Sequence, residues 1–167
     1  MAITVETGAI VAGADSYVSQ ADFIAFALTT GVVIAAEQAT DDMLVKAFYY
    51  LNSLETKLLG ERTTKAQPNV YPRLGLIIED YSWLSTEIPR QVILAQELLA
   101  LDLNAGIDIY NRPQSASTPV KRKRVEGAVE VEYAVSDASK VSSQTHAMAV
   151  LRSLMTNGGM SLVVSRG

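Results

Sequence analysis

The chain has 167 residues, 49% of them hydrophobic and only 19% charged, with no cysteine and a formal net charge of −4. These values fit a single domain, part of whose surface is covered by partner subunits. The absence of cysteine excludes disulfides and thiolate metal sites. The acidic balance disfavours non-specific nucleic-acid binding, because that binding depends on neutralising phosphates, and no apolar run predicts a membrane span or a signal peptide.

The first part of the chain predicts an extended arm and two helices. Residues 1–18 show no helical period and predict a short strand or an extended arm. Ser19 is the predicted N-cap of the first helix, and Gly31 is its predicted left-handed C-cap. A second, amphipathic helix is predicted from Thr40 to Gly60, because apolar residues recur there at intervals of three and four.

The middle of the chain predicts a long connection and a buried helix. Residues 61–85 contain Pro68 and Pro72, which exclude a continuous helix, and connections of this length are usually functional or make contacts. A third helix is predicted from near Thr86 to Gly106. It is apolar on most sides, which is typical of a helix that is buried or faces a neighbouring subunit.

The predicted fold class is mainly α, a small bundle of about four helices with a protruding β-hairpin and extended terminal arms. We expect a single domain over residues 1–167. Its predicted parts are a helical body at 19–105 and 142–155, a linker plus hairpin at 107–135, and a C-terminal tail at 156–167.

The predicted hairpin joins a basic run to an acidic run in the segment "VKRKRVEGAVEVEY". A two-residue turn at residues 126–127 places Lys123 opposite Glu130 and Lys121 opposite Glu132. Cross-strand pairs of opposite charge contribute roughly 0.2–1 kcal/mol each, so the basic run has a neutralising partner within the same hairpin.

The other face of the predicted hairpin carries Arg122 and Arg124, which stay free to contact an acidic partner. Because an isolated two-stranded hairpin is only marginally stable in water, we expect it to pair with a strand of a neighbouring subunit. The alternative interpretation is a nucleic-acid-binding arm formed by the four basic residues at 121–124.

The sequence contains no recognisable enzyme motif. His146 is the only histidine and has no metal-ligand partner at helical spacing. Trp83 with Tyr81 could stack on a nucleic-acid base, but two loop anchors buried in the core are the simpler interpretation. We therefore expect no catalytic activity, no cofactor and no metal.

Short motifs along nearly the whole chain resemble a family of phage proteins. The motifs that carry the likeness are "GADSYVSQADFIAFA", "MLVKAFYYLNSL", "VYPRLGL", "EIPRQVILAQELLAL" and "VKRKRVEGAVEVEY". Tyr71 stands where the family's loop has tryptophan. Some members are labelled DnaT-like single-stranded DNA-binding proteins, whereas the architecture is similar to that of the head–tail connector, or head completion, proteins of tailed phages.

The resemblance implies a structural virion protein, a head-to-tail adaptor at the neck between capsid and tail. It implies a homo-oligomeric ring, usually of twelve subunits, that joins the portal protein to a downstream tail or collar protein and lets DNA pass only as cargo, with no membrane partner. The alternative function is a DnaT-like single-stranded DNA-binding replication protein. The predicted interface residues are Arg73, Lys121, Arg122, Lys123, Arg124, Glu130, Glu132, Tyr133 and Arg166.

Overall fold

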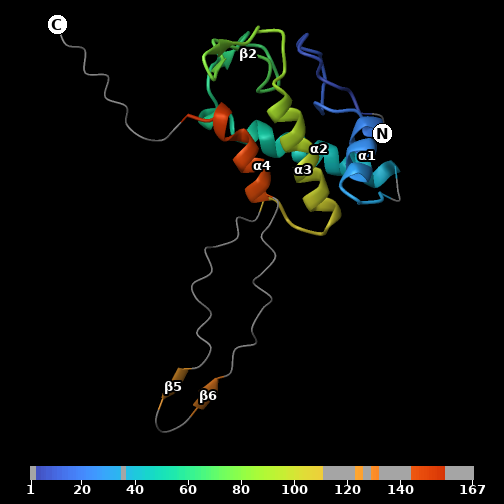
Figure 1. The fold of residues 1–167 in the computed structure, drawn as a ribbon, viewed down its shortest axis with the longest axis vertical. Coiled ribbons are helices and arrows are strands. Elements are labelled where there is room, and N and C mark those ends of the chain that lie inside the picture. Colours follow the sequence, from blue (N-terminus) through green and yellow to red (C-terminus); the bar gives the residue numbers. More distant parts are fainter. Residues whose placement is uncertain (1–2, 35–36, 111–122, 126–128, 132–143, 157–167) are drawn as a thin grey trace, which may run out of the picture.

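The computed structural model describes residues 3–34, 37–110, 123–125, 129–131 and 144–156. Within these ranges four α-helices form the body, and short antiparallel strand pairs lie in the connections (Figure 1). The predicted mainly-α fold is therefore confirmed.

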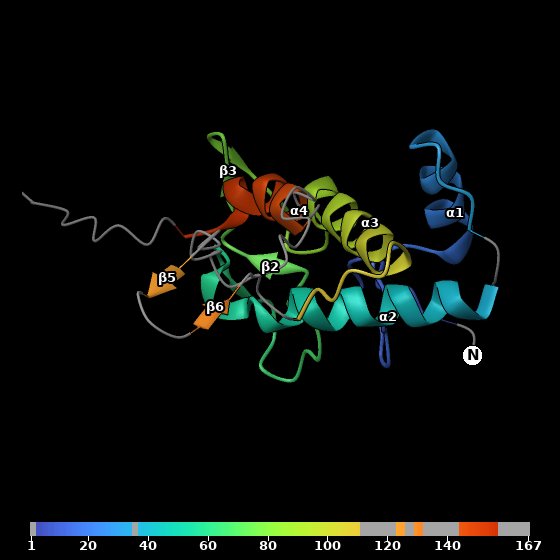
Figure 2. The same cartoon turned by 90° about the horizontal axis from the view of Figure 1, so that it is seen from below.

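The four helices pack around α3. Their bounds are α1 Gln20–Thr29, α2 Glu37–Ser53, α3 Arg90–Asn104 and α4 Gln144–Leu151, and the 3-10 helices Glu55–Lys57 and Arg152–Leu154 follow α2 and α4. The third helix contacts the other three, and α1 also contacts α2. In Figure 2, α2 spans the width of the helical body, with α3 and α4 on one side of it.

Local capping signals place the first helix where the sequence predicts it. The Ser19 hydroxyl accepts a hydrogen bond from the backbone N–H of Asp22 at 3.1 Å, which satisfies one of the free donors at the start of α1. After the helix, Gly31 has a φ of 79°, the left-handed value that glycine adopts without strain.

The starts of α2 and α3 differ from the prediction. α2 begins at Glu37 and ends at Ser53, so Thr40 is not a cap but a fully buried residue inside the helix. α3 begins at Arg90 instead of near Thr86, because Pro89 is the N-cap and keeps an extended ψ of 137°. The residue before a proline is disfavoured in helical conformation, which explains this delayed start.

The core lies between α3 and its neighbours. Its largest fully buried apolar side chains come from all four helices and the connections. They include Phe23, Leu44, Phe48, Tyr71, Leu76, Leu99, Ile109, Leu151 and Leu154. This confirms that α3 is the central helix, since its apolar residues face neighbours on several sides.

A buried amide ties the first segment of the chain to this core. Gln96 of α3 accepts the backbone N–H of Tyr17 at 2.8 Å and donates to the Ser16 hydroxyl and the Leu44 carbonyl, both at 2.9 Å. Ser16 in turn bridges to Val5, so residues 3–18 form a loop that folds back on itself. The segment is extended, as predicted, and it is packed on its own body.

Buried Glu6 fixes the tip of this loop. Its carboxylate accepts the backbone N–H groups of Gly8, Ile10 and Val11 at 2.9–3.0 Å and the amide of Asn69 at 3.2 Å. Four donors satisfy a carboxylate that is only 1% exposed, which is how a buried charge is tolerated.

Two small strand pairs lie in the connection between α2 and α3. β1 Glu61–Arg62 pairs with β2 Arg73–Leu74, and β3 Ile77–Ile78 pairs with β4 Tyr81–Ser82. A third pair, β5 Lys123–Val125 with β6 Val129–Val131, forms the predicted hairpin and stands apart from the helices in Figure 1.

Candidate nucleic-acid interface

Charge is unevenly divided between the helical body and the segment that carries the hairpin. Residues 1–110 and 144–156 contain seven Lys or Arg and fourteen Asp or Glu, a formal charge of −7. Residues 111–143 contain six Lys or Arg and four Asp or Glu, a formal charge of +2. Because phosphates are held mainly by cations, the segment 111–143 is the part of the chain best suited to nucleic acid.

Two of the arginines in the body are already occupied by partners within the chain. Arg62 forms a bidentate pair with the Glu55 carboxylate at 2.5 and 2.6 Å, which lowers the pKa of that carboxyl. Arg73 is only 5% exposed and donates to the carbonyls of Leu59 and Gly60 at 2.7 and 2.5 Å. Its guanidinium therefore holds the connection together, a role that the predicted interface did not include.

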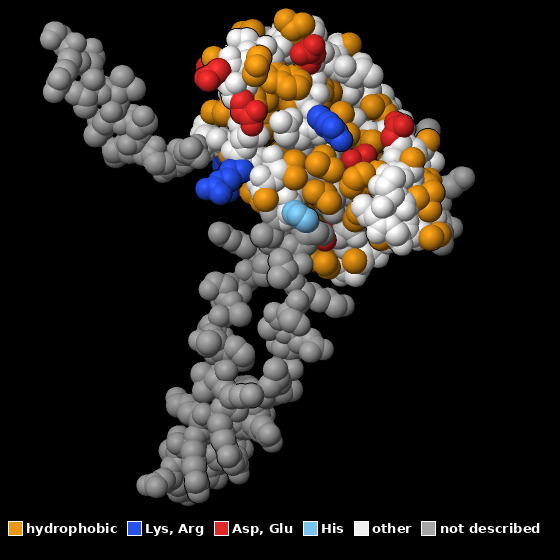
Figure 3. All heavy atoms as spheres, viewed as in Figure 1, with side chains coloured by type: hydrophobic (Ala, Val, Ile, Leu, Met, Phe, Trp, Pro, Cys, Tyr) orange, Lys and Arg blue, Asp and Glu red, His pale blue; other side chains and the backbone are white. Residues whose placement is uncertain are grey.

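The remaining cations of the body do not gather in a groove. Lys and Arg side chains are sparse on the face drawn in Figure 3. Of three cavities formed by described residues, one has a cation on its wall, and that cation is Lys46.

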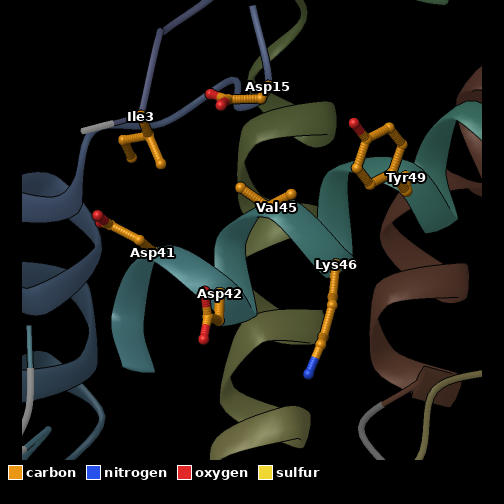
Figure 4. Close-up of a pocket in the computed structure, with 7 residues that line it drawn as sticks. All are labelled: Ile3, Asp15, Asp41, Asp42, Val45, Lys46 and Tyr49. Atoms are coloured by element: carbon orange, nitrogen blue, oxygen red, sulfur yellow. The ribbon is translucent and has the colours of Figure 1, made fainter. Parts of the chain in front are cut away.

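The cavity that contains Lys46 has more acidic than basic residues on its wall. It encloses about 350 Å³ and is shown in Figure 4. Its lining residues are Ile3, Asp15, Asp41, Asp42, Val45, Lys46 and Tyr49. The Lys46 side chain points away from Asp15 in this view, so three aspartates and one outward lysine surround the space. Such a wall repels phosphate, and this cavity is not a phosphate site.

Three tyrosines form a second feature on the surface of α2, which we call the α2 tyrosine surface: Tyr49, Tyr50 and Tyr110. Tyr49 is 59% exposed and Tyr110 is 56% exposed. The rings of Tyr50 and Tyr110 meet edge to face with centroids 6.0 Å apart, and the Tyr110 hydroxyl donates to the Lys46 carbonyl at 2.8 Å. Partial burial raises the pKa of Tyr110, and neighbouring Asp108 and Tyr49 raise it further.

The α2 tyrosine surface lies where the chain enters its cation-rich segment. Tyr110 is held on α2, and residue 111 begins the segment with six cations. Sites for single-stranded nucleic acid combine cations that follow the backbone with exposed aromatic rings on which bases stack. The described residues thus supply exposed aromatic rings at the point where the chain enters the cation-rich segment.

The hairpin has a different register from the predicted one. Arg124 lies opposite Glu130, Val125 opposite Val129, and Lys123 opposite Val131. Three residues, 126–128, separate the strands where a two-residue turn was predicted, and this shifts the pairing by one position. The predicted Lys123–Glu130 pair is wrong, and Arg124 takes its place as the partner of Glu130.

Several predicted interface residues lie outside the described residues. They are Lys121, Arg122, Glu132, Tyr133 and Arg166. The predicted pairing of Lys121 with Glu132 therefore stays a prediction.

Of the two aromatic residues in and just after β4, only Trp83 follows the simpler interpretation of a buried loop anchor. Trp83 packs partly buried against the core and lines a cavity together with Glu6 and Glu87, whereas Tyr81 is 75% exposed. A cavity lined by two carboxylates is unfavourable for nucleic acid, so Trp83 is an anchor of the loop.

Within the described ranges, no three His, Cys, Asp or Glu side chains are grouped so that they could hold a metal ion. None of the helices in those ranges has the length and apolar character that crossing a membrane requires.

The comparisons with known proteins point to DNA. A family model described as "Putative DnaT-like ssDNA binding protein" matches residues 1–167. No curated protein and no solved structure matches the chain. The family match corrects the predicted head-to-tail adaptor, with its connector ring, its portal partner and DNA as passing cargo, and it favours the alternative function of single-stranded DNA binding. The chain belongs to the family of DnaT-like single-stranded DNA-binding proteins.

Proposed function

We propose that the protein binds single-stranded DNA through its basic run, residues 121–124, and the α2 tyrosine surface. The observation that carries the proposal is the position of the exposed rings of Tyr49 and Tyr110 at the start of the cation-rich segment. The cations would contact phosphates, and the tyrosine rings would offer stacking surfaces to unpaired bases. The protein acts in this proposal through binding alone and is not an enzyme.

The spacing between the two halves allows them to act on one strand. Lys121 follows Tyr110 by eleven positions in the chain. A chain of this length spans at most about 36 Å when extended, so the basic run can reach phosphates on either side of a base that stacks on the tyrosines.

The acidic body limits binding to these elements. With a formal charge of −7 over residues 1–110 and 144–156, the body repels phosphates that approach it. Because four cations form the run, the logarithm of the binding constant should fall with the logarithm of salt concentration with a slope of about −3, from about 0.7 per phosphate contact on single strands.

The test is fluorescence anisotropy of a labelled oligothymidylate titrated with the full chain at several salt concentrations. Replacing Lys121, Arg122, Lys123 and Arg124 together by Gln should abolish the salt dependence and most of the affinity. Replacing Tyr49 and Tyr110 by Ala should weaken binding about tenfold or more at an unchanged slope, since stacking contributes roughly 1–3 kcal/mol per base.

The matched control is Tyr81→Ala, which removes an even more exposed tyrosine from β4. It should leave affinity unchanged. Binding that survives the fourfold Gln variant with the same salt slope would refute the proposal, as would an absence of binding at low salt.

A further inference from the structure

Exposed apolar side chains gather on the connection between α2 and α3. The described residues expose eight large hydrophobic side chains, and four of them lie between residues 74 and 84. Figure 3 shows orange side chains grouped at the top of the molecule, where Figure 1 draws this connection.

The β3–β4 hairpin presents its apolar side chains on both faces. Leu76 and Ile78, exposed by only 1% and 5%, face the body. Ile77 lies between them and alternation along β3 turns it to the other face, where it is 57% exposed, and Leu84, two residues after β4, is 65% exposed. The outer face of an antiparallel pair is usually polar when water covers it, so an apolar outer face indicates a contact surface.

A groove extends this surface towards β1 and β2. It encloses about 390 Å³ between Gly60, Glu61, Leu74 and Gly75, and Leu74 is 55% exposed. Gly60 allows its segment to approach β2 this closely, because a Cβ atom at residue 60 would lie 2.7 Å from the Leu74 carbonyl oxygen. We call Leu74, Ile77 and Leu84 the hairpin patch.

The last described residues pair with the segment that precedes this groove. Met155 bridges to Leu58 in antiparallel orientation. The Leu59 N–H donates to the Leu154 carbonyl and the Thr156 N–H donates to the Lys57 carbonyl, both at 2.8 Å. Thr156 thus lies beside Lys57, three positions before Gly60, and the antiparallel pairing directs the chain away from Gly60 there. The segment that follows must turn back to reach the groove.

The sequence of that segment complements the hairpin patch. Asn157, Gly158 and Gly159 favour a change of direction, and "MSLVVSR" follows. In extended conformation Met160, Leu162 and Val164 share one face. The segment contains no acidic residue and ends its apolar run at Arg166, whereas the turn of the β3–β4 hairpin consists of exposed Glu79 and Asp80.

We propose that residues 160–166 pack on the hairpin patch of the same chain, with the apolar side chains over Ile77 and Leu84 and Arg166 towards the acidic turn. The eight residue-to-residue steps from Thr156 to Val164 reach at most about 26 Å. A short connection gives an effective concentration in the millimolar range, which favours the chain's own segment over that of a second copy. Burial of apolar surface on both sides drives the contact.

The test uses paramagnetic relaxation in the full chain. The protein contains no cysteine, so Ser165→Cys provides one attachment point for a nitroxide, on the face of the segment turned away from the patch. Amide signals of residues 74–84 should lose most of their intensity, whereas those of α1 should keep theirs. Retained intensity at residues 74–84 would overturn the proposal.

Paired variants separate specific packing from a general apolar attraction. Ile77→Ser with Leu84→Ser should restore the signals of residues 74–84. Leu28→Ser with Val33→Ser, which replaces side chains that are 57% and 77% exposed elsewhere, should not restore them. Equal restoration by both pairs would contradict the proposal.

A second set of samples tests which chain supplies the segment. Leu162→Ser with Val164→Ser should restore the signals, whereas Val163→Ser on the opposite face should leave them attenuated. Mixing nitroxide-labelled chains without ¹⁵N with ¹⁵N chains without nitroxide should give no attenuation. Attenuation in this mixture as strong as in the single labelled chain would overturn packing within one chain in favour of exchange between copies. None of these measurements uses DNA, so their outcome is independent of the proposed DNA binding.

Discussion

At the scale of single residues, burial gives one carboxyl an unusual titration. Glu97 lies on α3 and is 9% exposed. Its pKa is raised to about 7, first by burial and then by the charge of Asp22, while Arg90 lowers it. A carboxyl whose pKa is higher in the folded state than in the unfolded state stabilises the fold when it is protonated.

The pH dependence of the free energy of unfolding follows from this raised pKa. The stabilising effect of protonated Glu97 is complete below about pH 4 and is lost as pH rises through about 7. We expect Glu97→Gln to raise the free energy of unfolding at pH 8 by about 1–3 kcal/mol and to flatten its pH dependence between about pH 5 and 8. Urea denaturation at both pH values measures this, with exposed Glu87→Gln as the control. Wild-type pH dependence in Glu97→Gln would contradict the assignment.

At the scale of elements, turn geometry decides how the small strand pairs form. Glu79 and Asp80 connect β3 to β4 with φ values of 51° and 67°. Left-handed backbone at both central positions is typical of a type I′ turn, for which Asn-Gly is the preferred sequence. Side chains with a Cβ atom cost roughly 1–2 kcal/mol per residue in this conformation.

Replacing the turn residues should therefore stabilise the hairpin. We expect Glu79→Asn with Asp80→Gly to raise the free energy of unfolding by about 1–2 kcal/mol, because both new residues accept positive φ more readily. Thermal denaturation measures the effect. Glu87→Asn removes an exposed carboxylate from outside the turn and should give no gain. A lower free energy of unfolding in the turn variant would show that contacts of the Glu79 and Asp80 side chains stabilise the fold by more than the backbone strain destabilises it.

At the scale of the whole molecule, folding and the proposed DNA binding reside in different parts of the chain. The described core lies within residues 3–110 and 144–156, whereas β5 and β6 pair with each other. Seven basic and fourteen acidic residues make the folded body a poor ligand for phosphate.

Deleting residues 119–135 should thus separate the two properties. We expect the deleted chain to keep its helical circular dichroism and its melting temperature, because the deletion removes no core residue of the described body. Its affinity for oligothymidylate should fall to the level of the fourfold Gln variant. Loss of helical structure in the deleted chain would show that the hairpin contributes to the core, and undiminished DNA affinity would move the site elsewhere.

Helix class, helix order and several helix ends could be predicted because their causes are local. Ser19 caps α1 by reaching a backbone N–H three residues away, and Gly31 ends it through its own backbone freedom. The start of α2 was missed, since Thr40 resembles a cap in sequence but is buried by neighbours that local patterns do not contain.

The candidate site, too, could be predicted from the sequence only in part. The basic run and its acidic counterpart are visible in the sequence, and so is the alternative of DNA binding, which the family match favours. The α2 tyrosine surface was missed because Tyr49 and Tyr110 are far apart in sequence. A local signal was available in Tyr110, an aromatic residue at the border of the cation-rich segment.

The sequence by itself determined the mainly-α architecture, the caps of α1, and the separation of an acidic body from a cationic segment, because each depends on composition or on neighbours along the chain. Only the tertiary structure decided that Arg73 is an internal anchor, that Glu97 titrates near neutrality, and that Tyr110 stands on α2. These properties arise from burial and from contacts between segments that lie far apart in the chain, and no local pattern encodes them.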